Sequence, residues 1–352
     1  MKLSLSFQNL KFKFEAGTSR GVLNDKKSWI VKIQDGDKIG YGEIAPLKGL
    51  SIEGYENFES KLITQLKQFV SKDFSIGQVN LSSSTKFGLE TALKAVNCSS
   101  AFKISENSFI TNQESIRING LVWMGAKEFM LKQIDDKISQ GFTCIKMKIG
   151  AINFDEELSI LKSIRKKYNS SDLTLRVDAN GAFEFDEAQN VLSILSSLDI
   201  HSIEQPIKQG QINLMNQLCQ MGYSCGVALD EELIGVENLE DKQCLLTTIK
   251  PQYIILKPTL HGGISGTKEW IKLAEDQNIK WWITSALESN IGLNAVCQIA
   301  SEYNPETYQG LGTGSLYNNN IPSPLTLDGE HIFYDQKKEW DLSHLDFVEI
   351  NP

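Results

Sequence analysis

The sequence predicts an α/β protein: a modified (β/α) TIM-like barrel with an N-terminal α+β capping domain. The first observation behind this prediction is a series of polar clusters, each at the end of an apolar run. The clusters are Lys146-Met147-Lys148, Asp178-Ala179-Asn180, Glu204-Gln205-Pro206, Asp230-Glu231 and Lys257-Pro258. Successive clusters lie 26 to 30 residues apart, which is the stride of one βα unit. The second observation is that roughly the first hundred residues do not follow this stride.

The first module, residues 1–103, is predicted to contain strands followed by helices. Alternating apolar residues predict a strand over 3–14, and a change of phase within it predicts a bulge or tight turn near Gln8-Asn9. Strands over 28–33 and 38–44 meet at the Asp35-Gly36 pair, which is a hairpin signal. Apolar residues at three- and four-residue intervals then predict helices over 55–70 and 84–96.

A polar stretch over 103–115 predicts the linker, and the barrel domain is expected over 116–322. Strand and helix patterns alternate through this domain. Strands are expected over 118–122, 143–149, 174–178, 202–204, 226–230, 253–257, 281–285 and 307–311. Helices are expected over 126–138, 155–168, 186–198, 214–221, 266–277 and 293–302, and residues 237–249 fill the fifth connection. The stretch after Pro322, about 323–352, breaks the stride and is expected to pack back on the first module and complete it.

Composition narrows the class of protein. A net charge of −9 and a pI near 5.2 argue against a nucleic-acid partner. No apolar run approaches the roughly 18 residues that span a bilayer, and the N-terminus does not resemble a signal peptide. Six cysteines without a C-x-x-C pair indicate free thiols in a reducing compartment. The sequence therefore predicts a cytoplasmic protein with a small-molecule partner, and it is also compatible with a homo-oligomer.

Strand alternation determines which polar side chains point together. Lys146 and Lys148 share one face of their strand, and Asp178 and Asn180 share one face of the next. The inward residues at the carboxyl ends of barrel strands line the active site. Carboxylates from three consecutive strands, Asp178, Glu204 and Asp230, suit Mg²⁺, which prefers oxygen ligands. No His or Cys lies in the clusters, which disfavours zinc.

The two lysine clusters would stand on opposite sides of such a metal. The neutral form of Lys148 would be favoured by the nearby cations, so this side chain could act as a base. Metal and lysines together would stabilise an enediolate, formed by removing a proton alpha to a carboxylate. Taken singly, these clusters have simpler explanations: edge-strand lysines, a turn or a helix cap. All five in order favour the catalytic interpretation.

The series K-M-K, R-V-D-A-N, I-E-Q-P, A-L-D-E and I-L-K-P-T-L-H-G-G resembles the enolase superfamily in its muconate-lactonizing subgroup. This resemblance covers nearly the whole chain. It implies Mg²⁺, for which Mn²⁺ can substitute, bound by Asp178, Glu204 and Asp230. It further implies Lys148 as the acid/base, Lys146 as its partner and Lys257 as the lysine across the site.

Within that subgroup the chain is most similar to the o-succinylbenzoate synthases, through Leu256–Leu260 with Gly262-Gly263 and through Ser285–Ser289 with Ile291–Leu293. The resemblance implies dehydration of 2-succinyl-6-hydroxy-2,4-cyclohexadiene-1-carboxylate to o-succinylbenzoate, a carbon–oxygen lyase step of menaquinone biosynthesis. Expected contacts with the carboxylate substrate are Arg20, Asn180, Ser285, Glu288 and Gly312. Two cap loops, near 17–24 and 45–51, are expected to close over the barrel mouth.

Two alternatives stay open. The same lysines would serve a dipeptide epimerase or an N-acylamino acid racemase of the subgroup. Epimerases usually carry an acidic D-x-D after the last strand, and residues 309–315 contain no acid, which favours the synthase. The other alternative is a non-catalytic barrel used for binding, which the loss of a ligand or a lysine would have indicated.

Overall fold

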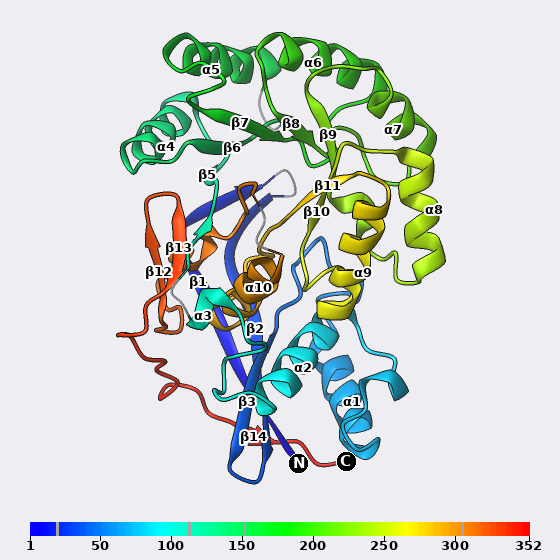
Figure 1. Cartoon of the computed structure of the whole chain (residues 1–352), viewed down its shortest axis with the longest axis vertical. Coiled ribbons are helices and arrows are strands. Elements are labelled where there is room, and N and C mark those ends of the chain that lie inside the picture. Colours follow the sequence, from blue (N-terminus) through cyan, green and yellow to red (C-terminus); the bar gives the residue numbers. More distant parts are fainter. Residues whose placement is uncertain (19–20, 112–113, 151–152, 304–305) are drawn as a thin grey trace.

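The computed structural model describes residues 1–18, 21–111, 114–150, 153–303 and 306–352. Figure 1 shows a curled parallel sheet surrounded by helices and, below it, an antiparallel sheet with its own helices. The antiparallel sheet has the order β14-β1-β2-β3. Its elements and helices are β1 (Lys2–Thr18), β2 (Gly21–Asp35), β3 (Lys38–Ile44), α1 (Phe58–Ser71), the 3₁₀ turn η1 (Ile76–Gln78), α2 (Ser83–Val96) and β14 (Val348–Glu349). The predicted order of cap strands and helices is therefore confirmed.

The predicted irregularity near Gln8-Asn9 is wrong. β1 pairs with β2 in unbroken antiparallel register from Lys2 through Lys11, and the register shifts only between Lys11 and Ala16. The sequence signal was nevertheless real, because the phase of burial does change along the strand.

The phase changes because opposite faces of β1 are covered at its two ends. Leu3 and Leu5 pack with the helices of the cap, in one cluster with residues of α1 and α2. Leu10 and Phe12 instead pack with Trp123 and its neighbours at the barrel mouth. A strand that changes its covered face needs no extra residue to change its apolar phase. β1 thus joins the cap core to the barrel.

Close backbone packing fixes α2 against β3. A Cβ added at Gly42 would lie 1.9 Å from the carbonyl oxygen of Gly88, and one added at Gly40 would lie 2.0 Å from that of Ala92. Because real Cβ atoms do not approach so closely, these positions require glycine. The contact brings α2 and the end of β3 into a fixed position beside the barrel.

The parallel sheet has seven strands in the described residues, ordered β11-β10-β9-β8-β7-β6-β5. The strands are β5 (Gly120–Val122), β6 (Cys144–Lys148), β7 (Thr174–Asp178), β8 (Ser202–Glu204), β9 (Gly226–Leu229), β10 (Tyr253–Leu256) and β11 (Lys280–Ile283). The helices are α4 (Lys127–Ser139), α5 (Phe154–Lys167), α6 (Phe185–Ser197), α7 (Ile212–Cys219), α8 (Leu239–Ile249), α9 (Gly263–Asp276) and α10 (Asn290–Glu302). Short 3₁₀ turns are η2 (Glu231–Leu233) and η3 (Gly312–Leu316).

The last expected strand, over 307–311, forms two isolated bridges instead of a full strand. Gln309 pairs with Ile118 beside β5, and Gly310 pairs with Thr284 just after β11. A Cβ at Gly310 would lie 2.1 Å from the Oγ1 of Thr284, so the close approach of the two edges depends on this glycine. These bridges connect the edges of the parallel sheet.

The expected linker and the C-terminal stretch both pack against the rest of the chain. Within 103–115 lies the short helix α3 (Ser108–Thr111), and Phe109 is fully buried. β12 (Leu325–Asp328) and β13 (His331–Tyr334) form a small sheet with β4 (Ile116–Arg117). β14 then pairs with β1 in the cap. The C-terminal stretch therefore contacts both modules.

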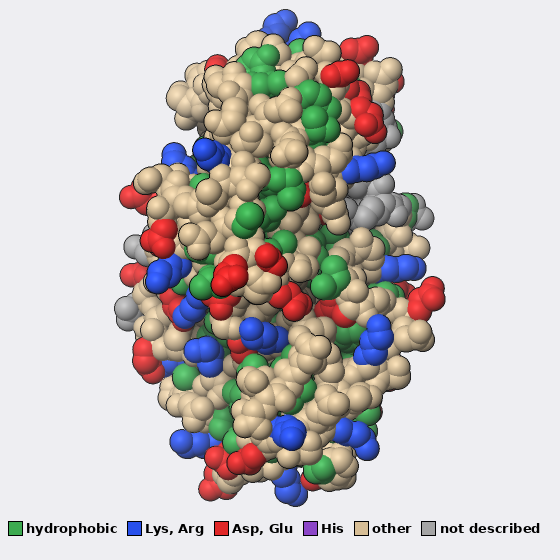
Figure 2. All heavy atoms as spheres, turned by 90° about the vertical axis from the view of Figure 1, so that its right-hand side faces the viewer, with side chains coloured by type: hydrophobic (Ala, Val, Ile, Leu, Met, Phe, Trp, Pro, Cys, Tyr) green, Lys and Arg blue, Asp and Glu red, His purple; other side chains and the backbone are tan. Residues whose placement is uncertain are grey.

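Acidic and basic side chains are interspersed on the face of the molecule shown in Figure 2. Among the described residues, helices of the length and apolarity needed to cross a membrane are absent.

Glu330 supports the small sheet beside the barrel, and its charge should contribute to stability. It accepts hydrogen bonds from the backbone N–H of Thr143 at 2.8 Å and from Arg117 at 3.0 Å. Burial opposes ionisation, but the bonds from Thr143 and Arg117 prevail and lower the pKa of Glu330. We expect Glu330→Gln to destabilise the fold by about 1.5–3 kcal/mol at neutral pH, as for a hydrogen bond to a charged group.

The sign of the pH dependence follows from the lowered pKa. Stabilisation by ionised Glu330 is fully present above the unfolded value of 4.5 and is lost as the pH falls through the lower folded pKa. Urea denaturation of wild type and Glu330→Gln should therefore show a difference at neutral pH that shrinks in acid. An equal difference at both pH values would exclude a contribution from the charge.

Candidate active site

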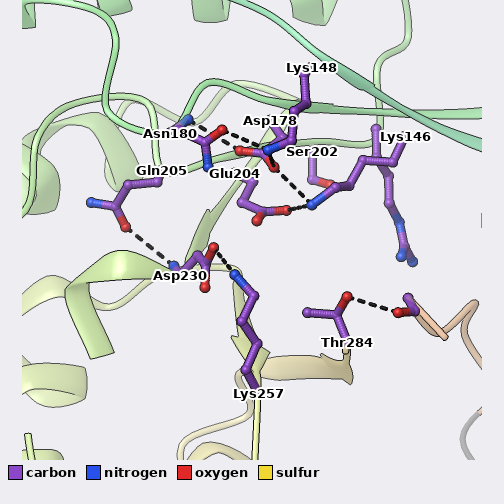
Figure 3. Close-up of polar contacts among 12 residues, drawn as sticks. Lys146, Lys148, Asp178, Asn180, Ser202, Glu204, Gln205, Asp230, Lys257 and Thr284 are labelled. Carbon is purple, nitrogen blue, oxygen red and sulfur yellow. Dashed lines mark hydrogen bonds and ion pairs between the residues drawn. The ribbon is translucent and has the colours of Figure 1, made fainter. Parts of the chain in front are cut away.

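The parallel register places the polar clusters at one level, at the carboxyl ends of the strands. Lys148 of β6 pairs with Asp178 of β7, and Asp178 pairs with Glu204 of β8. Asp230 directly follows β9 and Lys257 directly follows β10. Figure 3 shows these side chains converging, with Lys148 and Lys257 reaching in from opposite sides.

On the first side, two lysines of β6 hold the carboxylates of the next two strands. Lys146 Nζ lies 2.5 Å from Glu204 Oε2 and 2.9 Å from Asp178 Oδ2. Lys148 Nζ lies 2.9 Å from the same Asp178 oxygen and donates to Asn180 Oδ1 at 2.7 Å. Both lysines point into the barrel because strand alternation turns Ile145 and Met147 outward, where they are buried.

On the opposite side, Lys257 forms an ion pair with Asp230. The backbone N–H of Lys257 donates to His261 Nδ1 at 2.9 Å, so this nitrogen of the ring is an acceptor. Burial lowers the pKa of His261 to about 3, which keeps the ring neutral. Gln205 fixes the next strand end, because its side-chain oxygen accepts from the N–H groups of Asp230 and Glu232, both at 3.2 Å.

Asn180 connects Lys148 to Glu231. Its side-chain oxygen accepts from Lys148, and its Nδ2 donates to Glu231 Oε1 at 3.0 Å. Its backbone N–H also donates to Asp178 Oδ1 at 3.1 Å, with φ at +47°. Asparagine tolerates this left-handed conformation better than most residues. Asn180 therefore orients Lys148.

The close packing of charges shifts their pKa values in both directions. Burial opposes every charge here, but Lys146 and Lys148 outweigh it and hold the pKa of Asp178 far below its ordinary value. Burial, reinforced by Asp178, raises the pKa of Glu204. For Lys257, burial is outweighed by Asp230 and Glu204, so its pKa is raised. Glu204 resists ionisation in this set. A further cation bound nearby would favour its ionised form.

The donor set fits a hard divalent cation. Glu204 Oε1 and Asp230 Oδ1 are buried and have no hydrogen-bond partner, which is costly for carboxylate oxygens unless a cation satisfies them. Among the described residues, no group of three or more acidic, His or Cys side chains is arranged to hold a metal ion. The second carboxylate oxygens of Glu204 and Asp230 contact Lys146 and Lys257. Oxygen-only donors of this kind suit Mg²⁺ better than zinc.

A cavity of about 460 Å³ opens above this polar floor. Seven of the expected site residues line it: Lys146, Lys148, Asp178, Asn180, Lys257, Ser285 and Gly312. Its walls are largely apolar and include Leu23, Leu47, Leu50, Trp123, Leu287 and Leu316. This combination of apolar walls with a few convergent polar groups is typical of small-molecule sites. Cap residues form part of the wall, as expected for the 45–51 loop.

Not all of the expected substrate contacts line the cavity. Ser285 and Gly312 line the cavity. Glu288 does not, because it is fully buried behind the wall, where it accepts from Ser285 Oγ and Thr259 Oγ1, both at 2.5 Å. Arg20 lies outside the described residues. Lys48 is an exposed cation at the cavity rim. It was not predicted from the sequence, because the sequence indicated only that its loop, residues 45–51, would cover the barrel mouth.

Comparison with known proteins determines the family. Residues 130–335 match the family model described as "Enolase C-terminal domain-like", and residues 15–96 match "MenC, N-terminal domain". The chain is 40% identical to an o-succinylbenzoate synthase of Desulfotalea psychrophila, over 94% of this chain and 98% of the relative. The chain belongs to the o-succinylbenzoate synthase family. Enzymes of this enolase-like family generally use a divalent metal ion.

Other relatives agree with membership in the o-succinylbenzoate synthase family. A synthase of Pasteurella multocida is 26% identical over 88% of this chain and 90% of the relative. The crystal structure of MenC from Desulfotalea psychrophila superimposes with a TM-score of 0.79 at 36% identity, covering 95% of this chain and 100% of that one. An N-succinyl Arg/Lys racemase of Bacillus cereus superimposes with a TM-score of 0.83 at 20% identity, covering 99% and 100%. This last likeness shows the fold alone.

Proposed function

We propose that this chain dehydrates 2-succinyl-6-hydroxy-2,4-cyclohexadiene-1-carboxylate to o-succinylbenzoate in menaquinone biosynthesis. The observation that carries the proposal is the placement of Lys148 and Lys257 on opposite sides of buried carboxylates, at the floor of the cavity. The family membership and the apolar walls, which suit a six-membered carbon ring, support the same substrate. Free cysteines, four of them buried, fit a reducing cytoplasm.

The chain's own groups can be given roles in this reaction. Neutral Lys148 Nζ takes the proton from the ring carbon alpha to the carboxylate, and the electron pair of that bond moves into an enediolate. When the adjacent carbon–oxygen bond breaks, protonated Lys148 returns the proton to the leaving hydroxide, so water departs and the ring becomes aromatic. Lys257 places a positive charge on the opposite side of the ring. Lys146 holds Asp178 and Glu204 in place through its two ion pairs.

Asp178, Glu204 and Asp230 are the proposed ligands of Mg²⁺, for which Mn²⁺ can substitute. When bound, the ion would supply positive charge that stabilises the carboxylate oxygens of the enediolate. The two unpartnered carboxylate oxygens of Glu204 and Asp230 support this assignment.

The epimerase alternative receives no support from the cavity wall. Gly310, Gly312, Thr313 and Ser315 line it, and the sequence over 309–315 has no acidic residue. A dipeptide ammonium would therefore meet no carboxylate from this segment, and burying it unpaired would be costly.

A steady-state assay of the purified, Mg²⁺-loaded protein separates these functions. The cyclohexadiene substrate, a panel of dipeptides and N-succinyl amino acids should be offered in parallel. We expect aromatic product from the first, with kcat/KM above that of every epimerisation or racemisation. A higher kcat/KM for a dipeptide would overturn the proposal in favour of the epimerase.

Cations of the cap should bind the distal carboxylate of the substrate. Arg20, expected from the family resemblance, and Lys48, at the cavity rim, are the two candidates. Arg20→Ala and Lys48→Ala should each raise KM more than they lower kcat, because a distant contact stabilises ground and transition states alike. Loss of a charged hydrogen bond, about 1.5–3 kcal/mol, corresponds to roughly 10- to 100-fold in KM.

Lys13→Ala provides the matched control, since Lys13 is exposed on the same cap sheet and does not line the cavity. Its kinetics should equal those of the wild type. If Arg20→Ala and Lys48→Ala also behave like the wild type, neither cation contacts the substrate.

A further inference from the structure

A buried charged cluster lies behind the cavity wall and takes no part in the reaction as described. It consists of Lys26 on β2, Glu43 at the end of β3, and Glu288 in the segment before α10. The three residues are 2%, 0% and 0% exposed. Burial lowers the pKa of Lys26 and raises that of Glu43. Burying charges of this kind destabilises a fold unless opposite charges and hydrogen bonds in good geometry compensate.

Glu288 holds one stretch of the cavity wall from behind. Its Oε2 accepts from Ser285 Oγ at 2.5 Å, and the same hydroxyl oxygen accepts from the backbone N–H of Leu287 at 2.9 Å. Ser285 and Leu287 both line the cavity. Leu287 has φ at +64°, an unfavourable conformation for a leucine that the surrounding contacts must maintain. The shape of the wall therefore depends on Glu288.

Lys26 brings the cap to the same stretch of wall. Its Nζ donates to the backbone oxygen of Ala286 at 2.6 Å, between the two wall residues. Its charge is also attracted by Glu288 and Glu43. Since Lys26 belongs to the cap and Ala286 to the barrel, this contact makes the wall conformation depend on how the cap is seated.

Glu43 fixes the far end of the segment. It accepts from the N–H groups of Ser289 and Gly292, both at 2.8 Å, at the first turn of α10. A Cβ at Gly292 would lie 2.8 Å from Glu43 Oε2, so this approach depends on glycine. A carboxylate at a helix N-terminus is favourable for the helix dipole. The cap thus contacts the wall segment at both of its ends.

We propose that Lys26 is a positioning residue for substrate binding: with Glu288, it sets the wall at residues 285–287 against the ring of the substrate when the cap is seated on the barrel. The assignment of a substrate to this wall rests on the proposed function. Lys26 itself touches no reacting atom. Its removal should therefore weaken binding of the substrate far more than it slows the chemistry on Lys148.

The test compares Lys26→Met with the matched control Lys27→Met. Lys27 follows Lys26 on the same strand, and its ammonium lies over the ring of Tyr55, away from the cluster. In Lys26→Met, KM should rise with kcat changed less than about threefold, and kcat/KM should fall about 10- to 100-fold, since misplacing a contact by about 1 Å can cost about 10²-fold. Lys27→Met should match the wild type.

Amide hydrogen exchange in the absence of substrate provides a second readout, independent of catalysis. Residues 285–289 should exchange faster in Lys26→Met than in wild type or Lys27→Met, while the barrel strands keep their protection. Unchanged exchange there would overturn the positioning role. Faster exchange with an unchanged KM would overturn its link to substrate. If even the wild type does not form o-succinylbenzoate, the proposed function fails, and exchange still decides the positioning role.

A double variant covers the case in which Lys26→Met does not fold because Glu288 is left buried and unpaired. Lys26→Met combined with Glu288→Gln removes that charge and keeps an amide near Ser285. It should fold, with faster exchange at 285–289 and the same rise in KM. Wild-type exchange and KM in the double variant would overturn the proposal.

Discussion

Lys148→Ala should lower kcat by at least about 10²- to 10⁴-fold, the contribution typical of a general acid–base group. The loss should be at the upper end of this range, because one nitrogen is assigned both the removal of the proton and its return to the leaving hydroxide. KM should change little, since the cavity walls stay in place. Steady-state kinetics on the Mg²⁺-loaded variant measure both quantities.

The control for this variant is Lys132→Ala, which removes an exposed lysine of α4. It should retain wild-type kcat. A Lys148→Ala protein that keeps wild-type kcat would remove Lys148 from the role of base and leave Lys257 as the candidate.

Asp178→Asn, Glu204→Gln and Asp230→Asn should each abolish turnover and weaken Mg²⁺ binding. Each variant removes one negative charge from a site that must neutralise a dication, and weaker metal binding lowers the charge available to the enediolate. Calorimetric titration of the chelator-treated proteins with Mg²⁺ measures binding directly. Turnover should vanish in chelator-treated wild type and return when Mg²⁺ or Mn²⁺ is added.

Asp186→Asn is the matched control, because Asp186 is exposed in the first turn of α6, in the connection after β7. It should bind Mg²⁺ and turn over like the wild type. Full activity of the wild type after complete removal of metal would contradict the ligand assignment.

The central site was predictable because it depends on register. Parallel strands of similar length bring their carboxyl ends to one level, so evenly spaced clusters necessarily meet. The structure places Lys148, Asp178 and Glu204 side by side for this reason. The inward direction of Lys146 and Lys148 followed equally well from alternation within a strand.

Features that depend on three-dimensional packing were not predictable in this way. The phase change in β1 indicated an irregularity near Gln8-Asn9, whereas the covered face changes there without one. Glu288 was expected as a substrate contact, but it lies beyond the end of β11 and after the left-handed turn at Leu287, and its carboxylate is buried behind the wall. The closing strand over 307–311 is reduced to bridges at Gln309 and Gly310, which sequence pattern cannot distinguish from a full strand.

The contribution of the cap to the cavity was likewise only partly predictable from the sequence. The loop over 45–51 was expected to close the barrel mouth because of its position and its glycine, and Leu47, Lys48 and Leu50 do line the cavity. Which of its side chains face inward depends on how the cap is seated on the barrel. That seating involves Lys26 and Glu43, which carried no signal in the sequence.

A crystal structure of the protein with Mg²⁺ and o-succinylbenzoate would test the central claim most directly. We predict that Mg²⁺ contacts Asp178, Glu204 and Asp230 together with the ring carboxylate of the product. The aromatic ring should lie between Lys148 Nζ on one face and Lys257 Nζ on the other, with Ser285 and Leu287 against the edge of the ring. A product bound with both lysines on the same face of the ring, or a metal held by other residues, would contradict the account.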